Sequence, residues 1–111
     1  MNLNSLIRAN YDTFVGLCGQ HKVSKLYAFG SSINENFDPA KSDIDLVVEL
    51  DMVDPVEYGG TLMSLWDRLE ELFSRRVDLL TTDSIKNPYS KKSIEATKKM
   101  IYDGQGEKVF V

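Results

Sequence analysis

The sequence has little cysteine, no long apolar run and no excess of basic charge, and each shortage excludes a class of protein. Its single cysteine, Cys18, cannot form an internal disulfide, which fits a reducing compartment. No apolar segment approaches the roughly 20 residues needed to cross a bilayer. The first residues also lack the basic stretch and apolar run of a signal peptide. We therefore expect a cytoplasmic protein with no membrane contact.

The charge balance is mildly acidic. Thirteen lysines and arginines against 17 aspartates and glutamates give a net charge of −4 at pH 7. Contacts with nucleic-acid phosphates require a basic surface, so we expect no direct nucleic-acid binding. A surplus of carboxylates suits a protein that gathers acidic side chains around a cation.

Length and composition indicate one folded domain. The chain has 111 residues, of which 42% are hydrophobic and 27% charged, as in ordinary globular proteins. This is enough for one hydrophobic core and too short for two. No repeat, low-complexity tract or linker divides it, so we expect residues 1–111 to form a single domain.

Apolar periodicity and capping residues predict three helices. The first runs from about Asn4 to Cys18, with Gly19 as its C-cap. The second is capped by Asp54 and begins at Pro55. The third opens at Asn87 and Pro88 and continues to about Met100.

Four segments are predicted as strands. Three cover residues 25–29, 43–50 and 76–80, and residues 108–111 could add a short fourth. In the second, every even position is apolar while the odd positions are mostly acidic. Strands with one apolar and one polar face, interspersed with helices, predict an α+β fold with a small mixed sheet. We expect helices to pack on one face of that sheet and leave the other open.

Three aspartates stand on the polar faces of these strands. Asp43 and Asp45 are two residues apart and so share a face, with Cα atoms about 6–7 Å apart. Asp78 alternates with Val77 and Leu79 and also points away from the core. If the two strands are neighbours, the three carboxylates converge, an arrangement that favours Mg²⁺ and its phosphate ligands. The alternative is that they are merely solvated, although aspartate is depleted in strands.

A glycine–serine turn follows the first predicted strand. Gly30 lets the backbone approach a bulky ligand, and Ser31 can donate its hydroxyl to a phosphate oxygen. No Walker P-loop sequence occurs in the chain. Taken alone, glycine–serine after a strand is usually just a turn, so its weight depends on the acids downstream.

These pieces occur together at a familiar spacing. Residues 26–31 (LYAFGS), then residues 42–48 (SDIDLVV), resemble the G-S…D-x-D signature of the DNA polymerase β-like nucleotidyltransferase superfamily. Residues 75–80 (RRVDLL) are similar to the strand that carries its third acid. The resemblance covers nearly the whole chain and is greatest to the minimal nucleotidyltransferase branch. It implies the polymerase β-like fold.

The resemblance also implies a role for each residue. Gly30 and Ser31 would bind the β- and γ-phosphates of ATP. Asp43 and Asp45 would hold Mg²⁺ or Mn²⁺, and Asp78 would share a metal and activate the incoming hydroxyl. Members of this branch are often antitoxins that pair with a HEPN-type toxin and transfer AMP to a toxin tyrosine. The expected activity is therefore protein adenylylation of such a partner.

The sequence departs from the family pattern in one loop. Ser32 stands where many members carry arginine, and Glu35 and Asp38 add negative charge. A missing cation near the triphosphate would weaken its binding. The alternative function is therefore an antitoxin with a weak or inactive site, which neutralises its partner by binding alone.

Other polar residues have simpler interpretations. Cys18 and His21 are expected to be structural. Arg75 and Arg76 could contact phosphate, but such a pair more often follows a helix end and solvates a strand start. Four lysines on one stretch of the last predicted helix indicate a solvated face or a surface for an acidic partner: Lys91, Lys92, Lys98 and Lys99.

Overall fold

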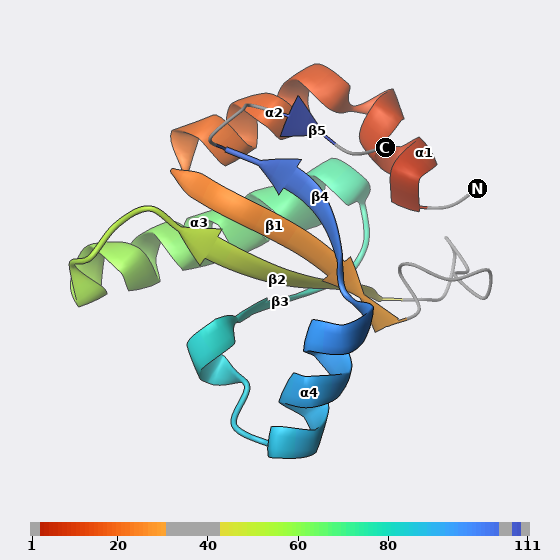
Figure 1. The fold of residues 1–111 in the computed structure, drawn as a ribbon. Coiled ribbons are helices and arrows are strands. Elements are labelled where there is room, and N and C mark those ends of the chain that lie inside the picture. Colours follow the sequence, from red (N-terminus) through yellow and green to blue (C-terminus); the bar gives the residue numbers. More distant parts are fainter. Residues whose placement is uncertain (1–2, 31–42, 105–107, 110–111) are drawn as a thin grey trace.

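A five-stranded mixed sheet forms the centre of the protein (Figure 1). The computed structural model describes residues 3–30, 43–104 and 108–109. Across the sheet the strands follow the order β3-β2-β1-β4-β5. In chain order they are β1 (Val23–Phe29), β2 (Ile44–Leu50), β3 (Val77–Thr81), β4 (Lys99–Asp103) and β5 (Lys108–Val109). β2 and β3 are parallel and the other neighbours are antiparallel, which confirms the predicted small mixed sheet.

Helices α1 (Leu3–Ala9), α2 (Tyr11–Gln20) and α3 (Pro55–Phe73) supply the layer that packs against this sheet. In Figure 1, α2 and α3 run along it, whereas α4 (Pro88–Thr97) lies apart from them, below the sheet. No residue of α4 is buried. The α+β class, with helices packed on one face, is confirmed. No helix in the described ranges is long and apolar enough to cross a membrane.

The core lies between the sheet and the three packed helices. The four apolar even positions of β2 are all buried in it, as their alternation predicts: Ile44, Leu46, Val48 and Leu50. Asp45 and Glu49 of the same strand face the other side. Val47 also lies on that side, yet it is only 2% exposed. The face opposite the core is therefore open at its acidic positions but not along its whole length.

Side-chain caps define the starts of two helices as predicted. Asp54 Oδ1 accepts a hydrogen bond from Val56 N at the start of α3. Asn87 Oδ1 accepts bonds from the N–H groups of Tyr89 and Ser90 at the start of α4. In both helices proline occupies the first turn, where no N–H is required.

The predicted single helix from Asn4 to Cys18 is wrong in two respects. The helix is divided at Asn10, whose side chain donates to Leu6 O and whose N–H bonds Ile7 O. Such local bonding by asparagine competes with the helical ladder. After the break, α2 continues to Gln20, so Gly19 lies inside the helix and is not its C-cap.

The last predicted helix, which runs to about Met100, is too long, because a strand begins at Lys99. α4 ends at Thr97, and β4 follows and pairs antiparallel with β1. Ile101 and Tyr102 of β4 are buried in the core. Pairing with β1 and burial of these two side chains decide the local structure, overriding helical propensity.

Candidate active site

Two of the three predicted acids lie side by side on adjacent strands. Asp45 of β2 is level with Asp78 of β3 in the parallel ladder, and both are half-buried. Asp43 directly precedes β2 and is exposed. The condition that the two strands be neighbours is therefore met. Strand alternation puts all three carboxylates on the face opposite the core.

Burial and the negative charges of the other two acids both act on the Asp45 carboxyl. The pKa of Asp45 is raised from 3.8 to about 6, first by burial and then by the negative charges of Asp78 and Asp43. Burial and like charges both disfavour the ionised form. At neutral pH the cluster is therefore unfavourable by itself, and a cation bound there would relieve the repulsion.

Gly30 directly follows β1 and lies against this cluster. Its neighbour Phe29 pairs with Asp45 across the strands, and Gly30 itself has a φ of +63°. A Cβ added at Gly30 would lie 2.8 Å from Asp45 Oδ2. Both the backbone conformation and the close approach therefore require glycine. Ser31, Ser32, Glu35 and Asp38 lie outside the described residues.

Side chains from α3 hold the strand that carries Asp78. Glu70 Oε2 accepts a hydrogen bond from Val77 N at 3.0 Å, and Trp66 Nε1 donates to Val77 O. Val77 directly precedes Asp78, so these two bonds fix the backbone from which Asp78 projects. No local sequence pattern marks Glu70, because its partner lies on another element.

The donor set fits a hard divalent cation that arrives with phosphate. In the described part of the chain, no three His, Cys, Asp or Glu side chains form a ready-made metal cage. Mg²⁺ usually takes only one or two protein carboxylates and completes its shell with water and substrate phosphates. Neighbouring carboxylates on an open face match that mode of binding better than a dedicated structural metal site.

Cys18 and His21 are structural, as expected. Burial raises the pKa of the Cys18 thiol to about 12, which leaves no thiolate for chemistry. The His21 ring is only 9% exposed and bonds on both sides, to Leu17 O at 2.8 Å and to Ser64 Oγ at 3.0 Å. Both residues serve the packing of α2.

Lys98 departs from the predicted solvated lysine face. Its Nζ lies 4.1 Å from the centroid of the Tyr27 ring and 3.0 Å from Glu95 Oε2. Since Leu26 and Ala28 point into the core, Tyr27 lies on the other face of β1. The end of α4 therefore rests on the face that carries the acids, while Lys91, Lys92 and Lys99 are exposed.

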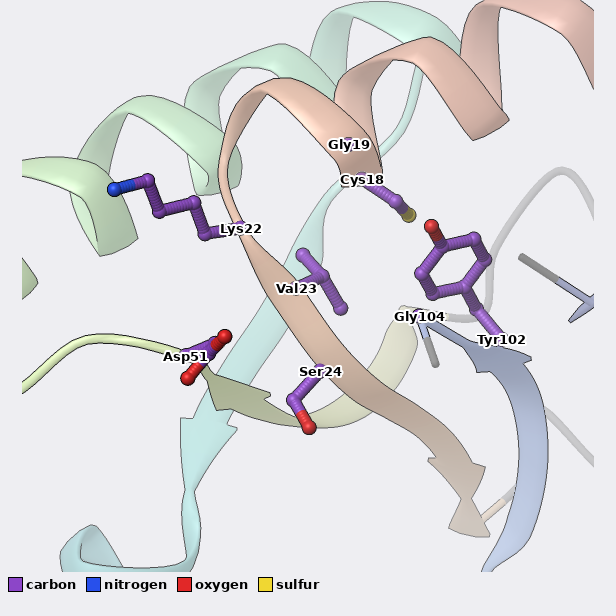
Figure 2. A pocket seen from close by; sticks show the side chains of 8 residues that line it. All are labelled: Cys18, Gly19, Lys22, Val23, Ser24, Asp51, Tyr102 and Gly104. Atoms are coloured by element: carbon purple, nitrogen blue, oxygen red, sulfur yellow. The ribbon is translucent and has the colours of Figure 1, made fainter. Parts of the chain in front are cut away.

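A pocket of about 540 Å³ opens at the other end of the sheet (Figure 2). The residues that line it come from the end of α2, the start of β1 and the ends of β2 and β4: Cys18, Gly19, Lys22, Val23, Ser24, Asp51, Tyr102 and Gly104. Figure 2 shows the Tyr102 hydroxyl turned toward Cys18, while Lys22 and Asp51 lie on the other side of Val23. The pocket contains none of the predicted site residues.

Comparison with known proteins assigns the family. Residues 14–101 match the family described as nucleotidyltransferase domain. Over 76 residues the chain is 40% identical to a protein of Methanocaldococcus jannaschii described as a “putative protein adenylyltransferase”. That match covers 68% of this chain and 74% of the relative. A second M. jannaschii protein with the same description matches equally well.

Solved structures show the same fold. A “putative minimal nucleotidyltransferase” superposes with a TM-score of 0.59 at 22% identity, covering 89% of this chain and 95% of that one. The toxin–antitoxin complex MntA-HepT gives 0.55 at 20% identity, covering 90% and 75%. A toxin–antitoxin structure with AMP-PNP gives 0.59 at 22% identity, covering 88% and 77%. The chain thus belongs to the nucleotidyltransferase domain family and is a nucleotidyltransferase.

Proposed function

We propose that this nucleotidyltransferase transfers AMP from ATP to a tyrosine hydroxyl of a partner protein, as the antitoxin of a HEPN-type toxin. The observation that carries the proposal is the row formed by Gly30, Asp45 and Asp78 on adjacent strands, with Asp43 beside it. It lies on the face that α1, α2 and α3 leave open.

Each residue has a distinct role in this reaction. Gly30 and Ser31 bind the β- and γ-phosphates, and Asp43, Asp45 and Asp78 hold Mg²⁺ or Mn²⁺. An ion held by these residues would supply positive charge against the triphosphate and the attacking oxygen. Asp78 positions the acceptor hydroxyl and receives its proton. A bond forms between the acceptor oxygen and the α-phosphorus, the bond to the α–β bridging oxygen breaks, and pyrophosphate leaves.

The choice of a protein acceptor is supported by the relatives. The M. jannaschii relative is described as a protein adenylyltransferase. One structural neighbour contains a tri-AMPylated Shewanella oneidensis HEPN toxin with its MNT antitoxin, at 20% identity and a TM-score of 0.55. We further propose that residues 1–111 act as a single domain, since all the packed helices and four of the strands contribute to one core cluster.

Labelled ATP tests the reaction directly. The protein is incubated with Mg²⁺, a co-expressed HEPN-type toxin and ATP labelled at the α-phosphate. We expect label on the toxin, and none when the label is in the γ-phosphate. Toxin labelled from the γ-position would identify a kinase and refute the proposal.

A binding-only antitoxin is the second candidate, favoured by Ser32 and the acidic Glu35 and Asp38 in the sequence of the loop. The double variant Asp43→Ala and Asp45→Ala separates the two functions. Under the leading proposal it loses both label transfer and toxin neutralisation while still folding. Full neutralisation by the double variant would show that binding alone is sufficient.

A further inference from the structure

Two adjacent arginines precede β3, and the structure separates them. Arg75 is half-buried, with its Nε atom inaccessible to solvent. Arg76 is exposed, and its side chain makes no hydrogen bond or ion pair with any of the described residues. Among the described residues, by contrast, Arg68 pairs with Glu71 and Lys98 with Glu95. Arg76 is therefore available to a ligand.

The strand register places Arg76 beside the acids. Ile44 N donates to Arg76 O at 3.0 Å, so Asp43, which precedes Ile44, is level with Arg76. Arg76 is also two residues before Asp78. Strand alternation puts those two side chains on the same face, with Cα atoms about 6–7 Å apart.

The order of the strands assigns Arg76 to one side of the reaction. Gly30 leaves β1 on one side of the β2 acids, while Arg76 precedes β3 on the other. In an in-line displacement, the leaving and attacking oxygens lie on opposite sides of the phosphorus. With the pyrophosphate at Gly30, the acceptor hydroxyl approaches from the side of β3. No described strand lies beyond β3 on that side.

We infer that Arg76 binds a carboxylate of the acceptor protein, on a residue next to the tyrosine that is modified. A guanidinium presents paired donors that match a carboxylate, and such charge-assisted bonds are stronger than neutral ones. Arg76 is then a specificity residue, which selects the acceptor and leaves ATP binding unchanged. The inference rests on the proposed function, because that function defines which side receives the acceptor.

Two fluorescent peptides test the inference by binding. Each contains one tyrosine, flanked by glutamates in one peptide and by glutamines in the other. Anisotropy is measured with Mg²⁺ and a non-hydrolysable ATP analogue. We expect the wild type to bind the glutamate peptide about tenfold more tightly. The net charge of −4 opposes this preference, so its appearance would indicate a local cation.

Matched variants locate that cation. Arg76→Gln should abolish the preference and Arg76→Lys should retain part of it. The control Arg68→Gln removes the same charge from α3, at a side chain that is 58% exposed, and should retain the full preference. Equal binding of the two peptides by wild type, or a preference that survives Arg76→Gln, overturns the inference.

Two further measurements test nucleotide binding and the proposed transfer reaction separately from the role of Arg76. The rise in melting temperature caused by Mg²⁺ and ATP should be unchanged in Arg76→Gln. Its loss would place Arg76 on the nucleotide side and overturn the inference. Transfer of α-label is scored separately on the HEPN-type toxin, so failure of the proposed reaction is distinguished from absence of a peptide preference.

Discussion

At the scale of single residues, the ionised Asp45 side chain destabilises the folded state of the ligand-free protein. Its carboxylate is half-buried between two other negative charges, and its pKa of about 6 lies above the ordinary value of 3.8. The folded chain therefore binds a proton more tightly than the unfolded chain does. By linkage, stability falls as pH rises between these two values.

The first prediction concerns this pH dependence. In metal-free buffer, Asp45→Asn should melt at a higher temperature than wild type at pH 7.5. The advantage should shrink steeply toward pH 4, where the folded wild type carries the proton and the unfolded chain is about half protonated. Thermal melts at the two pH values measure it. The control Asp67→Asn removes an exposed charge from α3. An Asp45→Asn advantage of equal size at both pH values would contradict the pKa shift.

Gly30 leads to the second prediction, in which activity and stability separate. Gly30→Ala forces a side chain into a left-handed conformation, at a cost of about 1–2 kcal/mol. It also displaces the Asp45 carboxylate, whose Oδ2 atom would lie 2.8 Å from the new Cβ. We expect adenylylation to fall at least tenfold, with only a modest loss in melting temperature.

Gly16→Ala is the matched control for this change. Gly16 lies in α2 with nothing within 4 Å of an added Cβ, so alanine there should leave activity unchanged. Normal activity in Gly30→Ala would show that the close approach of Gly30 to Asp45 has no part in the site.

At the scale of elements, α3 does more than cover the core. Its Trp66 and Glu70 bond the backbone of Val77 and so set the position of β3. The first turns of the same helix contain Gly59 and Gly60, which lie in open space. Helix propensity predicts a weak start there, yet α3 begins at Pro55, where the Asp54 cap compensates.

The third prediction uses two glycines with opposite surroundings. Gly60→Ala should stabilise the protein by about 0.5–1 kcal/mol, because glycine weakens a helix interior and nothing obstructs the new methyl group. Gly104→Ala should destabilise it, since the added Cβ would lie 2.2 Å from Val23 O. Urea unfolding compares the two variants with wild type. Changes of the same sign would contradict the described packing.

Local patterns predicted the elements that carry their own signal. The alternation in residues 44–50 identified β2 and its acidic face, and Asp54 and Asn87 marked two helix starts. β4 could not be predicted, because its strand conformation comes from pairing with β1. The same holds within the site. Alternation with apolar strand residues identified Asp43, Asp45 and Asp78. Glu70 could not be identified in this way, because it acts through a contact between elements distant in sequence.

At the scale of the whole molecule, nucleotide binding should increase the stability of the folded protein against unfolding. The fourth prediction is that Mg²⁺ with ATP raises the melting temperature, because a ligand that binds only the native state stabilises it. The gain is about 2.7 kcal/mol at a ligand concentration 100 times Kd. ATP with a chelator should have little effect, and Asp43→Ala should reduce the shift. No shift at millimolar Mg²⁺ and ATP would refute an intact nucleotide site.

The parallel pairing of β2 with β3 also determines when the acid cluster can form during folding. β1 and β2 are antiparallel neighbours, but β3 reaches β2 only after the chain has passed through α3. Pairings across such crossovers form slowly, because the chain loses conformational entropy on closing the loop before the stabilising contacts are made. A refolding chain therefore lacks the Asp45–Asp78 pair until α3 has docked. If the chain binds a metal–nucleotide complex at this cluster, binding followed in time would report the completion of folding.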